Sequence, residues 1–192
     1  MEETKQGGVR NIEQVECLWN NIVDMPRLNG NGYRLLLDIC INFQGHTTQK
    51  EFLEKRKWKQ SSVSNTLTKL VQYEFLLCRQ IPKTKKMEYY VNPALMQKRK
   101  KHRKICVDFD TFVIVWNEIR EYSFMSSNNY RIFIDVLLFY EQVSSVELCE
   151  EREWKLSSTY ASLKKLYEHQ LLLCNMEQGQ TMYSVNKKYF QI

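Results

Sequence analysis

The chain has 192 residues, of which 43% are hydrophobic and 26% are charged. This length can bury one large core or two small ones, and the composition lies well outside that of disordered chains. No apolar run approaches the ~20 residues that a transmembrane helix needs, and the first residues lack the pattern of a secretory signal. We therefore expect a cytoplasmic protein with no membrane partner.

The net charge of +6 is unevenly distributed. Residues 1–107 hold 20 Lys and Arg against 10 Asp and Glu, whereas residues 108–192 hold 8 against 12. A chain that concentrates positive charge in one part usually offers that part to a polyanion. The alternative is that two solvated surfaces simply differ in charge.

Helical patterns come first along the chain. Residues 12–22 carry apolar side chains at helical spacing, and residues 33–43 are apolar enough to form a largely buried helix. Residues 47–56 predict a short helix, in which Thr48 is the N-cap and Glu51 completes a capping box.

A third helix and two strands follow. Residues 60–75 place apolar side chains three and four positions apart on one face, which leaves the opposite face to short polar side chains. Residues 75–81 and 87–92 then predict two strands, and Pro82 interrupts the run between them. We expect a β-hairpin here.

A basic segment follows the hairpin. Asn92 and Pro93 are typical of a helix start, so the sequence predicts a linking helix over residues 94–107. The segment carries a run of cations that includes Lys98, Arg99, Lys100 and Lys101. Such a run serves as a nuclear localisation signal, a solvated helix face or a clamp for phosphates.

The second half of the chain repeats the first. Ten of 21 positions are identical between residues 58–78 and residues 154–174. Further upstream, residues 33–43 match residues 130–140, and the gaps fall between the predicted elements. Chance does not produce this agreement, so the same order of elements is predicted twice.

That order is helix, short helix, turn, helix and hairpin, which is the order of a winged helix-turn-helix. Residues 47–95 resemble the DNA-binding core of MarR-type winged-helix regulators, with Trp58 in the apolar turn before the recognition helix. The resemblance covers residues 33–93 and, through the repeat, residues 130–186. It implies a mainly α fold with small β-hairpin wings (α+β), built from two winged helix-turn-helix domains.

We place a basic winged-helix domain at residues 1–93, a basic linker helix at 94–107 and an acidic winged-helix domain at 108–192. MarR-type proteins act as dimers, so the resemblance implies that one chain supplies both halves as an internal dimer. The halves would be related by a pseudo-twofold axis, with the seam at Trp19 and Trp116. We therefore expect a monomer.

The recognition helix of the first half suits the DNA major groove, because its outward side chains are short and polar. Asn65 can pair bidentately with adenine, and the serines at the helix start suit a phosphate. The expected DNA contacts of this half are Ser61, Ser62, Ser64, Asn65, Thr68 and Lys69 on the helix, Lys83, Lys85 and Lys86 at the hairpin tip, and Lys98, Arg99, Lys100 and Lys101 in the linker. The alternative is an ordinary solvated helix face.

The second half has a weaker DNA-binding pattern. Its hairpin tip carries Gln178 and Gln180 and no cation. Its expected DNA contacts are Ser157, Ser158, Tyr160, Lys164 and Lys165. Two interpretations stay open. Either both halves contact DNA, or the second half is a scaffold for the first; in both cases its acidic surface is available to other proteins of the same genetic element.

Neither catalysis nor a metal nor a cofactor is expected. The three histidines lie in no nucleophile motif, and the sequence has no glycine-rich phosphate loop. The six cysteines have no metal-ligand spacing, so we interpret them as reduced core residues.

The sequence therefore predicts a double-stranded DNA-binding protein, a regulator or accessory factor of a mobile element or plasmid in conjugative transfer or transcription control. It is similar in arrangement to small winged-helix accessory proteins of Gram-positive conjugative plasmids. A tandem winged-helix plasmid replication initiator is one alternative. Another is a scaffold subunit that binds proteins and no DNA, as tandem winged helices do in endosomal sorting complexes.

Overall fold

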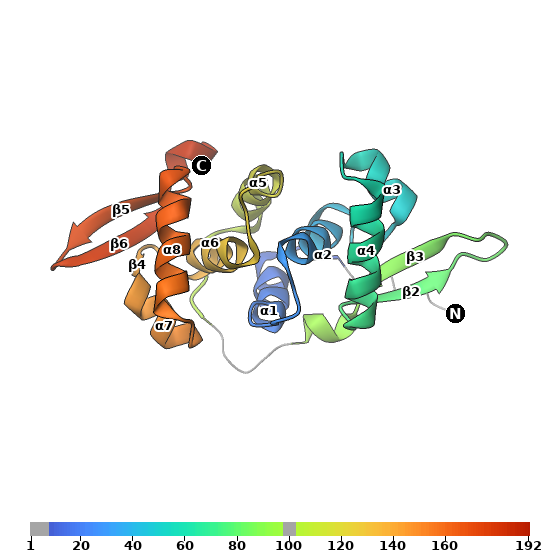
Figure 1. Cartoon of the computed structure of the whole chain (residues 1–192), viewed down its shortest axis with the longest axis horizontal. Coiled ribbons are helices and arrows are strands. Elements are labelled where there is room, and N and C mark those ends of the chain that lie inside the picture. Colours follow the sequence, from blue (N-terminus) through green and yellow to red (C-terminus); the bar gives the residue numbers. More distant parts are fainter. Residues whose placement is uncertain (1–7, 98–102) are drawn as a thin grey trace. The chain divides into compact units, whose positions relative to one another are not determined.

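Each half of the chain folds into helices and a small antiparallel sheet (Figure 1). The computed structural model describes residues 8–97 and 103–192, and the chain divides at residue 100 into two compact units. We call these unit 1 and unit 2. The predicted fold class is confirmed, because the described chain is mainly helical and each unit carries one three-stranded sheet.

The described residues of unit 1, 8–97, form four α-helices, three strands and one 3-10 helix. In chain order these are α1 (Ile12–Ile22), α2 (Gly30–Asn42), β1 (His46–Thr48), α3 (Gln49–Lys55), α4 (Gln60–Gln72), β2 (Leu76–Gln80), β3 (Met87–Val91) and η1 (Pro93–Met96). The sheet order is β1-β3-β2, and both pairings are antiparallel. The predicted helices and the predicted hairpin of the first half are thus confirmed.

Unit 2 has the same order of elements, with a short helix at its end. The elements are α5 (Phe109–Ile119), α6 (Ser127–Phe139), β4 (Val143–Ser144), α7 (Ser145–Arg152), α8 (Leu156–Glu168), β5 (Leu172–Glu177), β6 (Gln180–Val185) and α9 (Lys187–Phe190). Its sheet order, β4-β6-β5, corresponds to that of unit 1. The internal repeat is therefore a repeat of structure.

The apolar faces predicted for the helices form the core of each unit. Val63, Leu67 and Leu70 on α4 are buried. Trp19 on α1 packs against Tyr33 on α2, with ring centroids 5.8 Å apart, and the equivalent rings of unit 2 lie 6.0 Å apart. The seam predicted at the two tryptophans stays a prediction.

Sequence patterns did not reveal the first strand of either sheet. β1 has three residues and β4 has two, which is too short for an alternation of apolar and polar side chains to stand out. β1 exists because its backbone pairs with β3, where Thr47 lies opposite Tyr89. Immediately after it, the Thr48 side chain accepts a hydrogen bond from the backbone N–H of Glu51, which confirms the predicted N-cap. The predicted capping box is wrong, because the Glu51 carboxylate accepts from Lys55 at 3.0 Å instead of from the backbone of Thr48.

The linker helix predicted over residues 94–107 is wrong in the part of it that the structure describes. Pro93–Met96 is a 3-10 helix, and residues 103–107 have no regular structure. The Asn21 amide on α1 donates to the carbonyls of Leu95 and Gln97 at 2.9 and 3.0 Å, which engages acceptors that a continuing helix would use. The linker cations Lys98, Arg99, Lys100 and Lys101 lie outside the described residues.

No helix in residues 8–97 or 103–192 is long and apolar enough to cross a membrane.

A buried ion pair joins the second helix of each unit to an arginine at the end of its third helix: Arg56 comes directly after α3, and Arg152 is the last residue of α7. Arg56 Nε donates to Asp38 Oδ2 at 2.6 Å, and the Asp38 side chain is 4% exposed. In unit 2, Arg152 Nε donates to Asp135 Oδ2 at 2.9 Å, and the Asp135 side chain is fully buried. The pair fixes the turn that leads into α4 or α8, because a buried carboxylate must keep its partner.

We expect Asp38→Ala to lower the free energy of unfolding by about 3–5 kcal/mol, because it leaves the Arg56 guanidinium buried without its carboxylate. Lys50→Ala is a matched control, since it breaks the exposed pair between Lys50 and Glu54, at 3.5 Å, and should cost about 0.3–0.5 kcal/mol. Urea denaturation followed by circular dichroism measures both. Equal losses in the two variants would contradict a structural role for the buried pair.

Candidate nucleic-acid interface

The polar face predicted for the recognition helix lies on α4 and is accessible to solvent. Ser61, Asn65 and Lys69 are exposed, and Ser62 and Ser64 are half-buried. None of these side chains is enclosed by the core of unit 1. The predicted base-reading and phosphate-binding groups of this helix are thus presented on one element.

Thr68 differs from the other predicted contacts on this helix. It is exposed, yet its hydroxyl donates to the Ser64 carbonyl within the same helix at 3.0 Å. A hydroxyl engaged in this way has its proton occupied and keeps only its acceptor capacity. A base contact by Thr68 would therefore be to an amino group.

The start of α4 has no side-chain cap. Lys59 is the N-cap residue, and it makes no capping hydrogen bond through its side chain. Ser61 and Ser62 are the second and third helical residues, so the N–H groups of this first turn are not satisfied by the N-cap side chain. Uncapped N–H groups beside exposed hydroxyls suit a phosphate oxygen.

The hairpin tip between β2 and β3 is held by its own hydrogen bonds. The backbone N–H of Ile81 donates to Lys86 O at 2.9 Å, and that of Thr84 donates to Ile81 O at 3.1 Å. Lys83 lies at the tip with φ of 60°, in the left-handed region. The tip is therefore a defined turn.

The cations of this tip are free to bind an external anion. Lys83, Lys85 and Lys86 are exposed, and none forms an ion pair with a carboxylate of the described chain. On the strands below, Arg79 is paired with Glu88 at 3.4 Å and lies over the Tyr90 ring. Burial and, to a smaller extent, a hydrogen bond to Glu88 raise the pKa of Tyr90 to about 12. Within the hairpin, the charge of Arg79 is thus neutralised by Glu88, whereas the three lysines at the tip are not paired with a carboxylate of the described residues.

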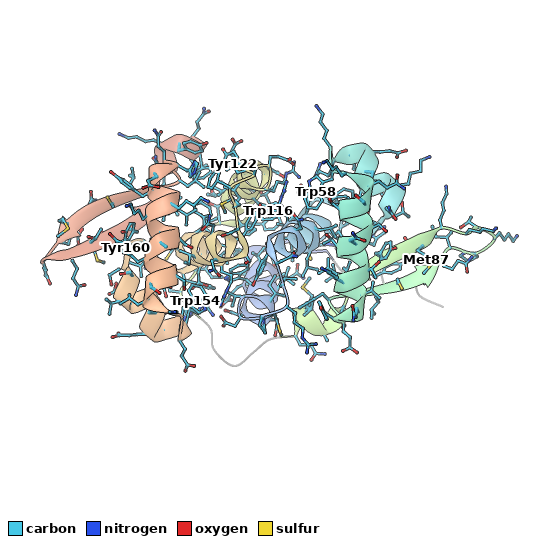
Figure 2. All side chains as sticks on the ribbon, viewed as in Figure 1. Trp58, Met87, Trp116, Tyr122, Trp154 and Tyr160 are labelled. Carbon is cyan, nitrogen blue, oxygen red and sulfur yellow. The ribbon has the colours of Figure 1, made fainter. Side chains whose placement is uncertain are left out.

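Unit 2 presents a different surface at the equivalent positions. Tyr160 on α8 is 52% exposed and replaces Ser64, and Leu156 is 51% exposed and replaces Gln60. Figure 2 shows Tyr160 on the side of α8 that faces the β5–β6 hairpin. Burial and the nearby Tyr160 raise the pKa of Tyr183 on β6. Unit 2 therefore exposes apolar side chains at two positions where unit 1 has polar ones.

The other predicted contacts of unit 2 are only partly free. Ser157, Lys164 and Lys165 are exposed, whereas the hydroxyl of the half-buried Ser158 donates to Lys155 O at 2.9 Å. Lys164 lies 3.9 Å from Glu168, one turn further along α8. The structure thus gathers these residues on one helix with less available hydrogen-bonding capacity than α4 has.

Sequence reasoning missed Arg27 as a member of this surface. It lies between α1 and α2, in a segment without a periodic pattern, and its guanidinium carbon is 5.3 Å from the centre of the Tyr73 ring at the end of α4. The sequence repeat gave one indication that these two residues belong together: the equivalent of Arg27 is Phe124, and the equivalent of Tyr73 is His169, so both residues differ between the halves. A change at both members of a contact marks a place where the two halves differ.

The architecture of the two units indicates a class of fold. Each unit places a helix-turn-helix before a β-hairpin in a three-stranded antiparallel sheet, which is consistent with a tandem winged-helix architecture. No protein-family model matches the sequence, and a search of curated proteins found no match. The likeness therefore rests on the order and pairing of the elements.

The prediction that the cysteines are core residues is wrong for most of them. All six are free thiols, but only Cys40 is buried, and Cys78 on β2 is exposed. Cys78 lies in the part of β2 that is exposed to solvent. Its apolar neighbours in the sequence therefore did not imply burial. In the part of the chain that the structure describes, no group of His, Cys, Asp or Glu is arranged to hold a metal ion.

We expect a thiol reagent to modify Cys78 before Cys40 in the native protein. Burial, with a smaller contribution from the Asp38 carboxylate, raises the pKa of the Cys40 thiol far above its ordinary value, so little reactive thiolate forms. Mass spectrometry of alkylated peptides at pH 8 measures the two rates, and Cys78→Ser should remove the faster one. Equal modification of both cysteines would show that the core of unit 1 opens readily.

Proposed function

We propose that the protein binds double-stranded DNA through unit 1, as a MarR-like tandem winged-helix regulator or accessory factor of a mobile element or plasmid. The observation that carries the proposal is the exposed polar face of α4 beside a hairpin tip with three unpaired lysines. A helix of this kind enters the major groove, and cations at the hairpin tip reach the flanking phosphates.

Electrostatics supports a polyanionic partner. The phosphates of a duplex are neutralised by Lys and Arg with release of counterions, so each such contact makes the affinity more dependent on salt. The tip supplies Lys83, Lys85 and Lys86, and α4 adds Lys69. These four side chains project from a unit whose sequence is rich in Lys and Arg, which favours association with DNA over association with a basic protein.

The side chains of α4 also support base reading. Asn65 is exposed on the helix, and no described residue engages its amide in a hydrogen bond, so both its donor and its acceptor are available. An adenine edge in the major groove offers one acceptor and one donor, which match this amide. Sequence preference in this proposal therefore resides mainly in Asn65, whereas the lysines supply affinity.

A second candidate function is favoured by the surface of unit 2. Leu156, Tyr160 and Tyr167 on α8 are each about half exposed, and Met176 on β5 is 69% exposed. Exposed apolar groups gathered on one element mark protein interaction sites. In this alternative, unit 2 is a scaffold that binds other proteins, and the chain as a whole contacts DNA through unit 1 or not at all.

Conjugative transfer, transcription control and replication initiation all make use of the same type of interface. The DNA target distinguishes them, since each process acts at a different place on the genetic element. Footprinting on the protein's own element locates the target. The length of the footprint also shows whether one unit or both units bind, because two units on successive turns of one DNA face would lie ~34–36 Å apart.

We expect the triple change of Lys83, Lys85 and Lys86 to Ala to weaken binding to all duplexes. Each lysine that no longer neutralises a phosphate should flatten the plot of log K against log salt by up to ~0.9. Mobility shifts with random-sequence duplex at several salt concentrations measure this slope.

The matched control is the change of Gln178 and Gln180 to Ala in the hairpin tip of unit 2, which removes no charge and should leave the slope unchanged. An unchanged slope in the lysine variant would remove the hairpin tip from the interface. Failure of the unaltered protein to bind duplex at low salt would contradict DNA binding and favour the scaffold function.

We expect Asn65→Ala to relax the preference at particular base pairs by ~1–3 kcal/mol, because alanine cannot make the bidentate hydrogen bonds of the amide. Fold stability should not fall, since Ala is the better helix former and already occupies the equivalent position 161 in unit 2. Binding to a panel of duplexes with single base-pair changes measures the preference, with Gln72→Ala at the end of α4 as the control. A uniform loss of affinity across the panel would argue against base reading.

A further inference from the structure

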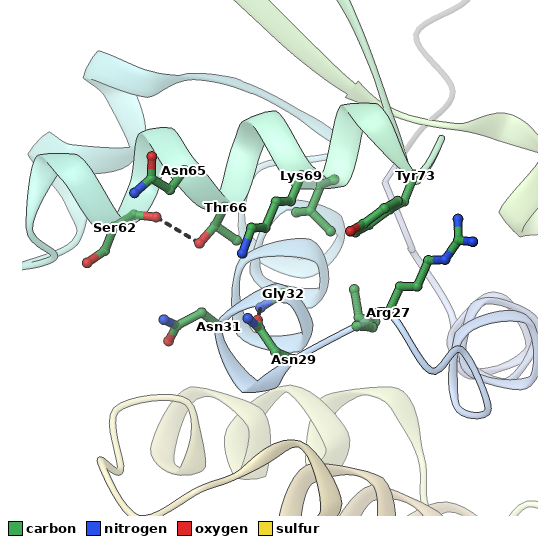
Figure 3. Close-up of a pocket in the computed structure, with 11 residues that line it drawn as sticks. Arg27, Asn29, Asn31, Gly32, Ser62, Asn65, Thr66, Lys69 and Tyr73 are labelled. Atoms are coloured by element: carbon green, nitrogen blue, oxygen red, sulfur yellow. Dashed lines mark hydrogen bonds between the residues drawn. The ribbon is translucent and has the colours of Figure 1, made fainter.

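A concave site lies between the start of α2 and the side of α4 in unit 1 (Figure 3). Its volume is about 190 Å³. Two cationic side chains, Arg27 and Lys69, line it together with amides and hydroxyls, and none of its lining residues is an aspartate or glutamate. The site therefore concentrates positive charge within a cavity.

The two cations have no counterion in the structure. Neither Arg27 nor Lys69 forms an ion pair with a carboxylate in residues 8–97 or 103–192; Arg27 lies over the ring of Tyr73, with its guanidinium carbon 5.3 Å from the centroid. Figure 3 shows the Lys69 side chain extending from α4 towards Asn29 and Asn31 at the start of α2. Like charges that line one cavity attract an anion, since each raises the potential that the anion experiences.

Some polar groups of the cavity are occupied, and these fix its shape. Asn29 Oδ1 accepts from the Gly32 N–H at 2.9 Å, and the Thr66 hydroxyl donates to Ser62 O at 2.7 Å. A Cβ at Gly32 would lie 2.9 Å from the Leu28 side chain, so a glycine keeps the floor of the cavity compact.

Other polar groups remain available for a ligand. No hydrogen bond within the described chain engages the side-chain amides of Asn31 and Asn65 or the hydroxyl of Tyr73. With Arg27 and Lys69 they offer guanidinium, ammonium, amide and phenol donors. This is the set of side chains that binds phosphate oxygens in protein–DNA complexes.

The internal repeat shows that the fold itself does not require three of the side chains that line this cavity. In unit 2 the equivalents of Arg27, Tyr73 and Asn65 are Phe124, His169 and Ala161. Phe124 stacks on His169 with ring centroids 3.7 Å apart, so an aromatic contact takes the place of the cation and its tyrosine. Unit 2 keeps the scaffold without this combination of cation and amides.

We infer that the cavity between α2 and α4 is a phosphate-binding site of unit 1. Arg27 and Lys69 supply the charge, and Asn31 and Tyr73 supply further hydrogen bonds, whereas Asn65 lies at the edge of the site and stays available to a base. The phosphate belongs either to the DNA backbone beside α4 or to a small phosphorylated anion. The DNA source rests on the proposed function, whereas the small anion does not.

The test titrates the full chain, labelled with ¹⁵N, with inorganic phosphate at constant pH and ionic strength. We expect saturable shifts of the Asn31 and Asn65 signals, which Arg27→Gln and Lys69→Gln each abolish. Lys188→Gln, which removes an exposed cation of α9 outside the site, should leave the shifts unchanged. Circular dichroism melting of each variant establishes that the fold is retained.

A second arm measures the salt dependence of duplex binding for the same variants. A slope lowered by about one in Arg27→Gln, together with the phosphate response, assigns the site to the DNA backbone. A phosphate response with an unaltered slope, or in a protein that binds no duplex, supports the site and assigns it to a small anion. The inference is overturned if folded protein gives no saturable phosphate response, or if Arg27→Gln and Lys69→Gln respond as the unaltered protein does.

Discussion

The orientation of α4 and of α8 depends on one buried ion pair in each unit. In unit 1 the Asp38 carboxylate on α2 holds the Arg56 guanidinium just beyond α3, and Asp135 and Arg152 repeat the arrangement in unit 2. A buried charge that loses its partner is costly, so the turn after the third helix has little freedom to shift. The next helix begins four residues after this arginine, and its start is therefore tied to the second helix of the unit. A polar surface on α4 is useful for recognition only because this constraint fixes its direction.

A cation–π contact reinforces the same connection. The Arg34 guanidinium lies over Trp58 at 4.4 Å, and Arg131 lies over Trp154 at 4.7 Å. Both members come from the segments that the two halves share in the sequence repeat, namely the second helix and the turn. Each unit thus clamps the turn to the second helix twice, once through a buried ion pair and once through an aromatic face. The tryptophan and the arginine are both repeated in the sequence, but the repeat alone did not show that they contact each other.

Periodic signals were predictable from the sequence, and contacts between distant segments were not. The apolar spacing of α4 and the hairpin after it follow from local pattern, and both lie where the pattern predicts them. The prediction of a linker helix was wrong because the amide of Asn21, more than seventy residues earlier, donates a hydrogen bond to a backbone carbonyl in the predicted helix. The burial predicted for Cys78 was wrong because every residue of the edge strand β2 after Leu76 is exposed, although the stretch is apolar in the sequence. Arg27 was missed because its role depends on the distant Tyr73.

The duplicated scaffold separates what the fold needs from what the surface of each unit does. The clamp of aspartate, arginine and tryptophan is kept in both units, so it belongs to the scaffold. The exposed positions diverge together: Ser64 becomes Tyr160, and a hairpin tip of lysines becomes one of glutamines. Random drift of a solvated surface would change charge and polarity independently at each position. The hairpin of unit 2 lacks the cations of unit 1, and its helix carries exposed aromatic groups instead, which agrees with the proposal that the two units bind different partners.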